Sequence, residues 1–381
     1  MGNYTTYVGM DVHARSIDCS AVDVVTGEVF RRAFTGNPDA SEVAEWVRSL
    51  PQPAYCAYES GCTGFHLCRD LRGLGVACDV IAVSTLARST KDRKGKCDKR
   101  DARAIRREIA NPDSDYSVVW VPDKRTEGQR ELVRSYRVAV DDLKRAKQRL
   151  SSMLLRHGYV WDERTPTGRL KKASGRAYDR WLDGIGFDDP ASEAAFGALR
   201  RQIRNAQQEV DELAALVGEL AEAPENKPYV DALAHIKGIE RRTALLARVE
   251  FGDFSRFSGG RKASMWLGTT PSDHSSGGHD AHGPITKSGN KHLRRALVEA
   301  LTGIDAWKSA KKSPPKGSTC SAACRDAASR CNERIRSRYR HLREDAGKCH
   351  NVAKVAVVNE LIRWIWAIGL EVQREQEAAA L

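Results

Sequence analysis

The sequence has no long hydrophobic run and no apolar leader. Across its 381 residues no stretch of about 18 uncharged apolar residues occurs, and the first residues, MGNYTTYVGMDVHARS, lack the apolar core of a signal peptide. We therefore expect a cytoplasmic protein that neither spans a membrane nor is exported. CxxC pairs are also missing among the ten cysteines. Their absence disfavours zinc binding by Cys320, Cys324, Cys331 and Cys349 with His350. In a chain of this length without an apolar leader, reduced thiols, buried or free, are the expected state.

Acidic residues are fewer than basic ones. The chain has 62 Lys and Arg against 50 Asp and Glu, a formal net charge of +12 with neutral histidine. This surplus makes an acidic polymer the first partner to consider. With 29% charged and 41% apolar residues the composition is that of a globular protein rather than a disordered one. At about 150 residues per domain, the length predicts two or three domains.

The N-terminal part has the pattern of an α/β domain. Three short β-rich runs come first, and helices then alternate with apolar, strand-like runs, which is the order of an RNase H-like fold. The β-rich runs are 4–12, 16–24 and 28–35, the expected helices are 39–50 and 64–72, and the later strands are PAYCAYES, ending in Glu59, and 76–83.

Helices dominate the remainder. In 196–220 the apolar residues alternate three- and four-residue steps, as a coiled-coil seam requires, and 130–154 has a similar helical period. A hairpin within one chain and a coiled coil between subunits explain this pattern equally well. Residues 158–192 and 268–290 are expected to be loops, 291–307 and 349–370 helices, and 233–249 a helical hairpin with or without phosphate-binding capacity.

Four acidic residues occupy positions suited to metal binding. Asp11 lies at the inner end of the first strand and Glu59 ends a later one, where α/β sheets carry their active sites. Asp98 and Asp101 are three residues apart in a helical segment and are expected on one face. Each acid alone would be an ordinary surface residue. If the four converge, their repulsion calls for divalent cations, and carboxylate oxygens suit Mg²⁺ or Mn²⁺ in phosphodiester chemistry.

Basic residues accompany these acids and recur after a later glycine-rich loop. Solvated helix faces account for part of this charge, but acidic ligands within a basic run favour a site that binds a polyanion and cuts it. The candidate nucleic-acid contacts are Arg93, Lys94, Lys96, Lys99, Arg100, Lys287, Lys291, Arg294 and Arg295.

The glycine-rich loop, PSDHSSGGHDAHG, offers Ser275 and Ser276 as nucleophiles. A serine hydroxyl needs activation by a base or by polarisation of its target. His274, His279 and His282 stand close by in the sequence and could be a base, a metal set or phosphate contacts. We favour phosphate contacts, because no orienting partner is evident.

Taken together, the pattern resembles the insertion-sequence-110 family of transposases, which includes the Piv-type DNA invertases. The resemblance spans nearly the whole chain and implies a RuvC-type, RNase H-like D-E-D-D domain over 1–125, a helical coiled-coil region over 126–228, a mainly α transposase domain with a serine loop over 229–370, and a polar tail over 371–381. The motifs that carry it are YVGMDVH, AYESGCTGF, CDKRDARAI, HIKGIERRTALLARVEFGDFSRF, WLGTTPSDHSSGG, ITKSGNKHLRRAL and GKCHNVAKVAVVNELIRWIW.

The resemblance also implies a mechanism. Its catalytic, Mg²⁺-binding tetrad would be Asp11, Glu59, Asp98 and Asp101, and Ser276 would be the nucleophile, with Ser275 as the less favoured register. The implied enzyme is a DNA recombinase of an insertion sequence that acts through a phosphoserine intermediate, as a dimer or tetramer, with donor and target DNA chosen by a structured bridge RNA. Lys237 and Glu240 depart from the usual Pro and Gly of the hairpin and weaken a phosphate role there.

Two other functions compete with this one. The first is a Mg²⁺-dependent, RuvC-like, structure-specific DNA nuclease that uses the four carboxylates and takes water as its nucleophile. The second is a non-catalytic nucleic-acid-binding protein in which the acids are surface charge.

Overall fold

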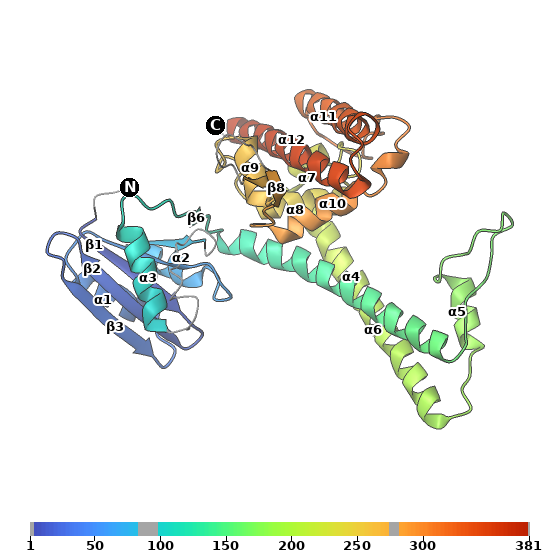
Figure 1. Cartoon of the computed structure of the whole chain (residues 1–381), viewed down its shortest axis with the longest axis horizontal. Coiled ribbons are helices and arrows are strands. Elements are labelled where there is room, and N and C mark those ends of the chain that lie inside the picture. Colours follow the sequence, from blue (N-terminus) through green and yellow to red (C-terminus); the bar gives the residue numbers. More distant parts are fainter. Residues whose placement is uncertain (1–3, 83–97, 274–281, 380–381) are drawn as a thin grey trace. The chain divides into compact units, whose positions relative to one another are not determined.

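The structure, a computed structural model, describes residues 4–82, 98–273 and 282–379. Of Asp98, Lys99, Asp273 and His282 it describes the backbone alone. The chain separates into two compact units, Met1–Lys124 and Arg125–Leu381 (Figure 1). This division falls next to the end expected for the N-terminal domain, and each unit has its own core.

The first unit contains a six-stranded mixed sheet. Its strand order is β3-β2-β1-β4-β5-β6, with β1, β4 and β5 parallel to one another and β2 and β6 antiparallel to their inner neighbours. The three-strand meander predicted from the sequence is confirmed. The strands are β1 (Thr6–Val12), β2 (Ser16–Asp23), β3 (Val29–Thr35), β4 (Ala54–Glu59), β5 (Ala77–Ile81) and β6 (Val118–Val119).

Alternation along the strands gives this sheet two different faces. Met10 and Tyr58 belong to a core shared with α1 (Ala40–Ser49) and α2 (His66–Gly73), both of which match predicted helices. The opposite face carries Tyr55 and Ala57, which share a smaller core with α3 (Asp98–Ala110). The sheet therefore has a helical layer on each side, and α3 covers the face toward which the odd-numbered residues of β1 and β4 point.

Two long helices begin the second unit, and they pack against each other within the chain. These are α4 (Lys124–Arg156) and α6 (Pro190–Glu222), and Ala139, Leu143 and Val210 form the apolar cluster between them. The structure thus shows the hairpin among the two arrangements considered for this region. Between them, the expected loop 158–192 contains a helix, α5 (Arg176–Asp183), because Leu182 is buried against the ends of α4 and α6.

The largest core of the chain lies in the helical bundle that follows, in yellow to red in Figure 1. The expected loop 268–290 contains a two-stranded ladder, and the last helix continues to Ala379, through the residues expected to form a polar tail. No helix in the described ranges is both long and apolar enough to cross a lipid bilayer. The elements are α7 (Lys227–Leu233), α8 (Arg241–Phe251), α9 (Gly260–Leu267), β7 (Pro271–Asp273), β8 (His282–Ile285), α10 (Lys291–Ala300), η3 (Ile304–Ala306), α11 (Ala322–Arg340), η4 (His341–Asp345) and α12 (His350–Ala379).

Candidate functional site

Two of the four predicted carboxylates end neighbouring parallel strands. The register of β1 and β4 pairs Met10 with Tyr58, and Asp11 and Glu59 are the next residues along each strand. Because successive side chains alternate, Asp11 and Glu59 point to the same face of the sheet, the one covered by α3. Both residues are half-buried. The carboxyl ends of parallel strands thus bring together two acids that lie almost fifty residues apart in the sequence.

A close approach between backbones fixes α3 beside this strand end. A Cβ on Gly9, two residues before Asp11, would lie 2.3 Å from the carbonyl oxygen of Ala102 and 2.3 Å from the amide nitrogen of Arg106. Only glycine permits this contact, so it holds α3 directly on β1. Asp101 immediately precedes Ala102 and therefore lies where the helix meets the strand.

Helical spacing shows which side of α3 carries the second pair of acids. Ile105 and Ile109 are buried against the sheet. Asp101 lies four residues before Ile105, on the same stripe, and is half-buried. Asp98 is the first residue of the helix, with only its backbone described. The sequence-predicted pair thus stands in the first turns of the helix that covers Asp11 and Glu59.

Near Asp11 the sheet also holds groups that the sequence analysis did not single out. Asp18 lies directly opposite Asp11 in the antiparallel ladder of β1 and β2, and like charges in that position repel each other unless a cation lies nearby. The hairpin spacing of β1 and β2 could have indicated this pair. The imidazole Nε2 of His13 lies 3.2 Å from Asp11 Oδ2. Among the side chains that the structure describes, no group of three His, Cys, Asp or Glu is close enough to hold a metal ion, and Asp98 is not among them.

The donor set nevertheless fits a hard divalent cation. Every predicted ligand in this part of the fold offers carboxylate oxygen, which Mg²⁺ and Mn²⁺ prefer over nitrogen or sulfur. The opposed carboxylates of Asp11 and Asp18 are a second reason, since a bound cation would relieve their repulsion.

The segment with the predicted nucleophile lies between two paired strands. In the ladder of β7 and β8, Pro271 pairs with Ile285 and Asp273 with His282. The Ser272 hydroxyl also donates to the carbonyl oxygen of Pro284, at 3.2 Å. The two ends of the serine segment are therefore held side by side. The predicted nucleophile Ser276, its alternative Ser275, and the basic residues Arg93, Lys94 and Lys96 lie outside the described residues.

Two glycines lock the base of this hairpin. A Cβ on Gly268 would lie 2.0 Å from the carbonyl oxygen of Ser288, and one on Gly289 would lie 2.0 Å from that of Trp266. Both glycines have positive φ, +72° and +83°, a backbone conformation that other residues rarely adopt. The segment that leaves β8 is thereby fixed against the end of α9, just before α10 begins.

A buried carboxylate anchors the same base. The Asn290 side chain accepts from the Leu293 amide at the start of α10, and its Nδ2 donates to Glu250 at 2.7 Å. Glu250 is only 1% exposed and also accepts two hydrogen bonds from Arg134 of α4, at 2.8 and 2.7 Å. Burial would raise the pKa of Glu250, but the hydrogen bonds and charge of Arg134 outweigh it and hold that pKa below its usual value.

The predicted basic contacts divide into two groups. Arg294 donates from Nη1 to the carbonyl oxygen of Leu267 at 2.7 Å, and Arg295 pairs with Asp141 at 2.7 Å and with Glu299 at 2.7 Å. These two guanidinium groups are occupied within the chain. Lys287, Lys291 and Arg100 are exposed, and of Lys99 only the backbone is described.

The turn between α7 and α8 is likewise occupied by the chain itself. Lys312 donates from Nζ to the carbonyl oxygen of Ile239 at 2.8 Å and pairs with Glu240 at 3.1 Å. Lys237 donates from Nζ to the carbonyl oxygen of Ser309 at 2.6 Å. Both lysines therefore tie the hairpin to the segment that follows α10.

Comparison with known proteins matches both the strand-end acids and the serine segment to transposase families. The family described as "Transposase IS116/IS110/IS902 family" matches residues 230–313, and a DEDD transposase family of the IS110 type matches residues 8–158. The first range contains the serine segment, and the second contains the strand-end acids and α3.

Curated relatives agree with these matches. A putative transposase of Sinorhizobium fredii is 31% identical over 97% of this chain and 89% of its own length. The transposase for insertion sequence element IS1533 of Leptospira borgpetersenii is 28% identical over 67% of this chain and 72% of its own. A probable family 20 transposase of Pseudomonas aeruginosa is 26% identical over 95% of this chain and 96% of its own.

Proposed function

Because this chain belongs to the IS116/IS110/IS902 family of insertion-sequence transposases, we propose that it cuts and rejoins DNA through a phosphoserine intermediate. In this proposal a carboxylate tetrad in the first unit and Ser276 in the second act on the same phosphodiester. The two half-sites come from one chain or from two copies of it, in a dimer or tetramer.

The observation that carries the proposal is the meeting of β1, β4 and α3. Asp11 and Glu59 face the helix whose first turns contain Asp98 and Asp101, and Gly9 keeps that helix on the strand. The sheet order, with an antiparallel meander beside parallel strands, supports an RNase H-like, RuvC-type fold for this unit. Asp11 and Glu59 on one face of the sheet, beside Asp101 in the first turns of α3, support phosphodiester chemistry rather than an ordinary structural role.

The tetrad would hold a divalent cation. Asp11, Glu59, Asp98 and Asp101 supply carboxylate oxygens, and Mg²⁺ or Mn²⁺, when bound, supplies positive charge against the phosphate. The chain's own part is to hold these oxygens on rigid elements. It also orients Asp11 through the neighbouring imidazole of His13.

The covalent step conserves phosphodiester bonds. Ser276 Oγ forms a bond to phosphorus, the bond from phosphorus to one sugar oxygen breaks, and the proton lost by serine balances the proton gained by the leaving sugar hydroxyl. Attack by a sugar hydroxyl of another strand reverses these steps and releases serine. The anchored strands β7 and β8 fix the two ends of the segment to which Ser276 belongs.

A structured bridge RNA is the proposed guide. The exposed lysines Lys287 and Lys291 and the basic segment before α3 suit two polyanions, the DNA and the RNA. Base pairing would then choose donor and target sequences, while the protein contacts backbones.

A pair of adjacent serine substitutions tests the nucleophile. With labelled donor DNA, bridge RNA and Mg²⁺, Ser276→Ala should abolish the covalent protein–DNA adduct while DNA and RNA binding remain, and Ser275→Ala should keep the adduct. Adducts that persist in Ser276→Ala would overturn the serine role. Nicking without any adduct in the unmodified chain would instead favour the water-dependent RuvC-like nuclease, whose acids all lie in the first unit.

Mixing two inactive variants tests whether the half-sites come from different copies. Asp11→Asn should lack strand cleavage, as should Ser276→Ala. If one copy supplies the tetrad and another the serine, a mixture of the two variants regains part of the activity. A mixture that stays inactive, although both variants assemble normally, places both half-sites in a single chain. Unchanged activity of Asp11→Asn in a transposition assay would point to the non-catalytic nucleic-acid-binding protein.

A further inference from the structure

The end of the second unit that carries α5 combines partly exposed aromatic rings with unpaired positive charge. Trp161, Tyr178 and Trp181 form one ring cluster, with centroid distances of 5.3 Å from Trp161 to Tyr178 and 5.4 Å from Tyr178 to Trp181. All three rings are half-buried, so each keeps part of its surface open to solvent. A cluster that served the core alone would be buried, as Phe251 and Phe254 are.

A groove opens beside this cluster. It lies among α4, α5 and α6, has a volume of about 1080 Å³, and is lined by Tyr178 and by the apolar side chains of Leu143, Leu182 and Ile203. Its own charges balance, with Lys144, Lys147 and Arg204 against Asp179, Asp211 and Glu212. The groove itself therefore combines apolar walls with balanced charges.

Positive charge is concentrated on the neighbouring segment. Arg164 and Lys171 are paired with Asp162 and Glu163. In the part of the chain that the structure describes, no carboxylate lies within ion-pair distance of four other exposed cations nearby. These four are Arg169, Lys172, Arg176 and Arg180.

We propose that this end of the α4–α6 hairpin binds unpaired nucleotides, with a base stacked at Tyr178 and the groove and with phosphates on the cations of residues 169–180. Aromatic platforms beside basic segments are how proteins hold single strands and loops, because every base has a π-face and every linkage a charge. The charge favours a polyanion over an apolar protein partner. The inference rests on the proposed function for its expectation that nucleic acid is present, but it concerns binding and not cleavage.

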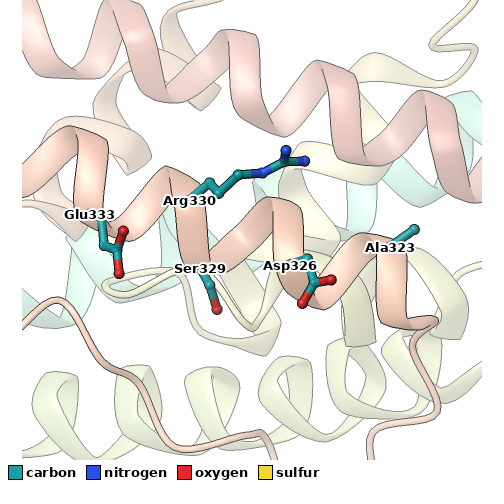
Figure 2. A pocket seen from close by; sticks show the side chains of 5 residues that line it. All are labelled: Ala323, Asp326, Ser329, Arg330 and Glu333. Carbon is teal, nitrogen blue, oxygen red and sulfur yellow. The ribbon is translucent and has the colours of Figure 1, made fainter.

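A second hollow, on α11, differs from the groove beside α5 and supplies control residues for the test. Figure 2 shows that its lining residues, among them Asp326, Arg330 and Glu333, all come from one helix, so it is a surface groove between side chains. Arg330 is exposed and distant in sequence from α5, as is Arg374 of α12. Removing Arg330 and Arg374 changes the net charge as much as removing Arg176 and Arg180 does, so this pair is a matched control.

Binding of short probes tests the proposal with the full chain. The probes are a mixed-sequence single-stranded RNA, the DNA of the same sequence, and its duplex, at about 50 and 200 mM salt. Tyr178→Leu should weaken single-strand binding about 5- to 150-fold, the range for one stacked base, whereas Tyr178→Phe should stay within about twofold of the unmodified chain. Arg176→Ala with Arg180→Ala should lower the slope of log K against log salt by about 1.4, and Arg330→Ala with Arg374→Ala should not.

The outcomes separate the possible sources. If Tyr178→Leu loses affinity for the RNA probe alone, the occupant is a guide-RNA loop. If it loses affinity for the single-stranded DNA probe alone, the occupant is an unwound DNA strand. If Tyr178→Leu loses as much affinity for the duplex as for the single strands, the stacking site is overturned, and the surface binds phosphates only. Unchanged affinity and salt slope in the Arg176→Ala, Arg180→Ala variant, whose side chains are exposed, overturn the proposal altogether. Ser276→Ala should bind these probes normally, so failure of the serine mechanism leaves this test unaffected.

Discussion

Removal of Arg134 should damage the base of the serine loop more than neutralisation of its partner. Arg134→Leu leaves the Glu250 carboxylate almost fully buried and removes two of the hydrogen bonds to its oxygens, while the bond from the Asn290 amide remains. Breaking a buried pair in this way costs about 3–5 kcal/mol. Since the Arg134 side chain is 38% exposed in the folded chain, we expect the lower end, about 3 kcal/mol. Glu250→Gln leaves a guanidinium that water can reach and should cost about 1–2 kcal/mol.

The sign of the pH dependence gives a second check on the same pair. In the unmodified chain the pKa of Glu250 is lowered, so its contribution to the free energy of unfolding is present above the unfolded pKa, near 4.5, and is lost as the pH falls through the folded pKa. In Arg134→Leu burial remains while the main lowering cause is gone, so the folded pKa rises above the unfolded value. The stability gap between variant and unmodified chain should therefore narrow as the pH falls from 7 to about 5.

Hydrogen exchange of the α8 amides measures this effect without requiring the whole chain to unfold in two states. A loss of about 3 kcal/mol corresponds to about 100-fold less protection in peptides from Arg241–Phe251. Glu250→Gln should lose far less protection and should flatten the pH dependence. Equal losses in the two variants, or a gap that widens on acidification, would refute the argument that Arg134 compensates a buried carboxylate.

Other substitutions probe the two half-sites. Gly9→Ala should push α3 away from β1 and reduce DNA strand cleavage as strongly as Asp11→Asn does. Gly73→Ala, at a position with open space around it, should keep full cleavage activity. The measurement is the cleavage rate of each variant at an equal folded fraction. Gly268→Ala should lower the melting temperature by more than Gly317→Ala does, because both have positive φ but only Gly268 meets another backbone. Lys291→Ala should lower the salt slope of duplex DNA binding by about 0.9, and a variant that keeps the full slope would remove that lysine from the interface.

The first unit could be predicted from sequence because its signals are local. Period-two alternation and turn residues identify the strands of the meander, and an Asp39 capping box begins α1 where the pattern predicts it. The position of Asp98 and Asp101 in the first turns of a helix also follows from local pattern. The pattern within each strand does not show that Asp18 lies opposite Asp11, because that pairing depends on the register between β1 and β2, which the spacing of the hairpin could have indicated.

The second unit was harder because its decisive contacts join distant segments. The helix α5 has eight residues, too few for a sustained helical period, and its burial depends on Phe196 and on Leu150 and Met153 of the long helices. The anchor at the base of the serine loop joins Arg134, Glu250 and Asn290, residues that lie far apart along the chain. Charged residues that enter a core in this way have the same sequence signature as a solvated helix face.

Fewer of the chain's cations are therefore available to nucleic acid than its net charge of +12 suggests. Arg130 is 9% exposed and donates to two backbone carbonyls, and Arg134 and Arg295 are each bound bidentately by carboxylates, so these cations have little to offer a phosphate. Because a guanidinium that is already paired gains less from a new anion, affinity for DNA or RNA should depend mainly on the exposed, unpaired cations. Along the described residues such cations gather at 169–180, beside an aromatic cluster, which is where unpaired nucleotides are best accommodated.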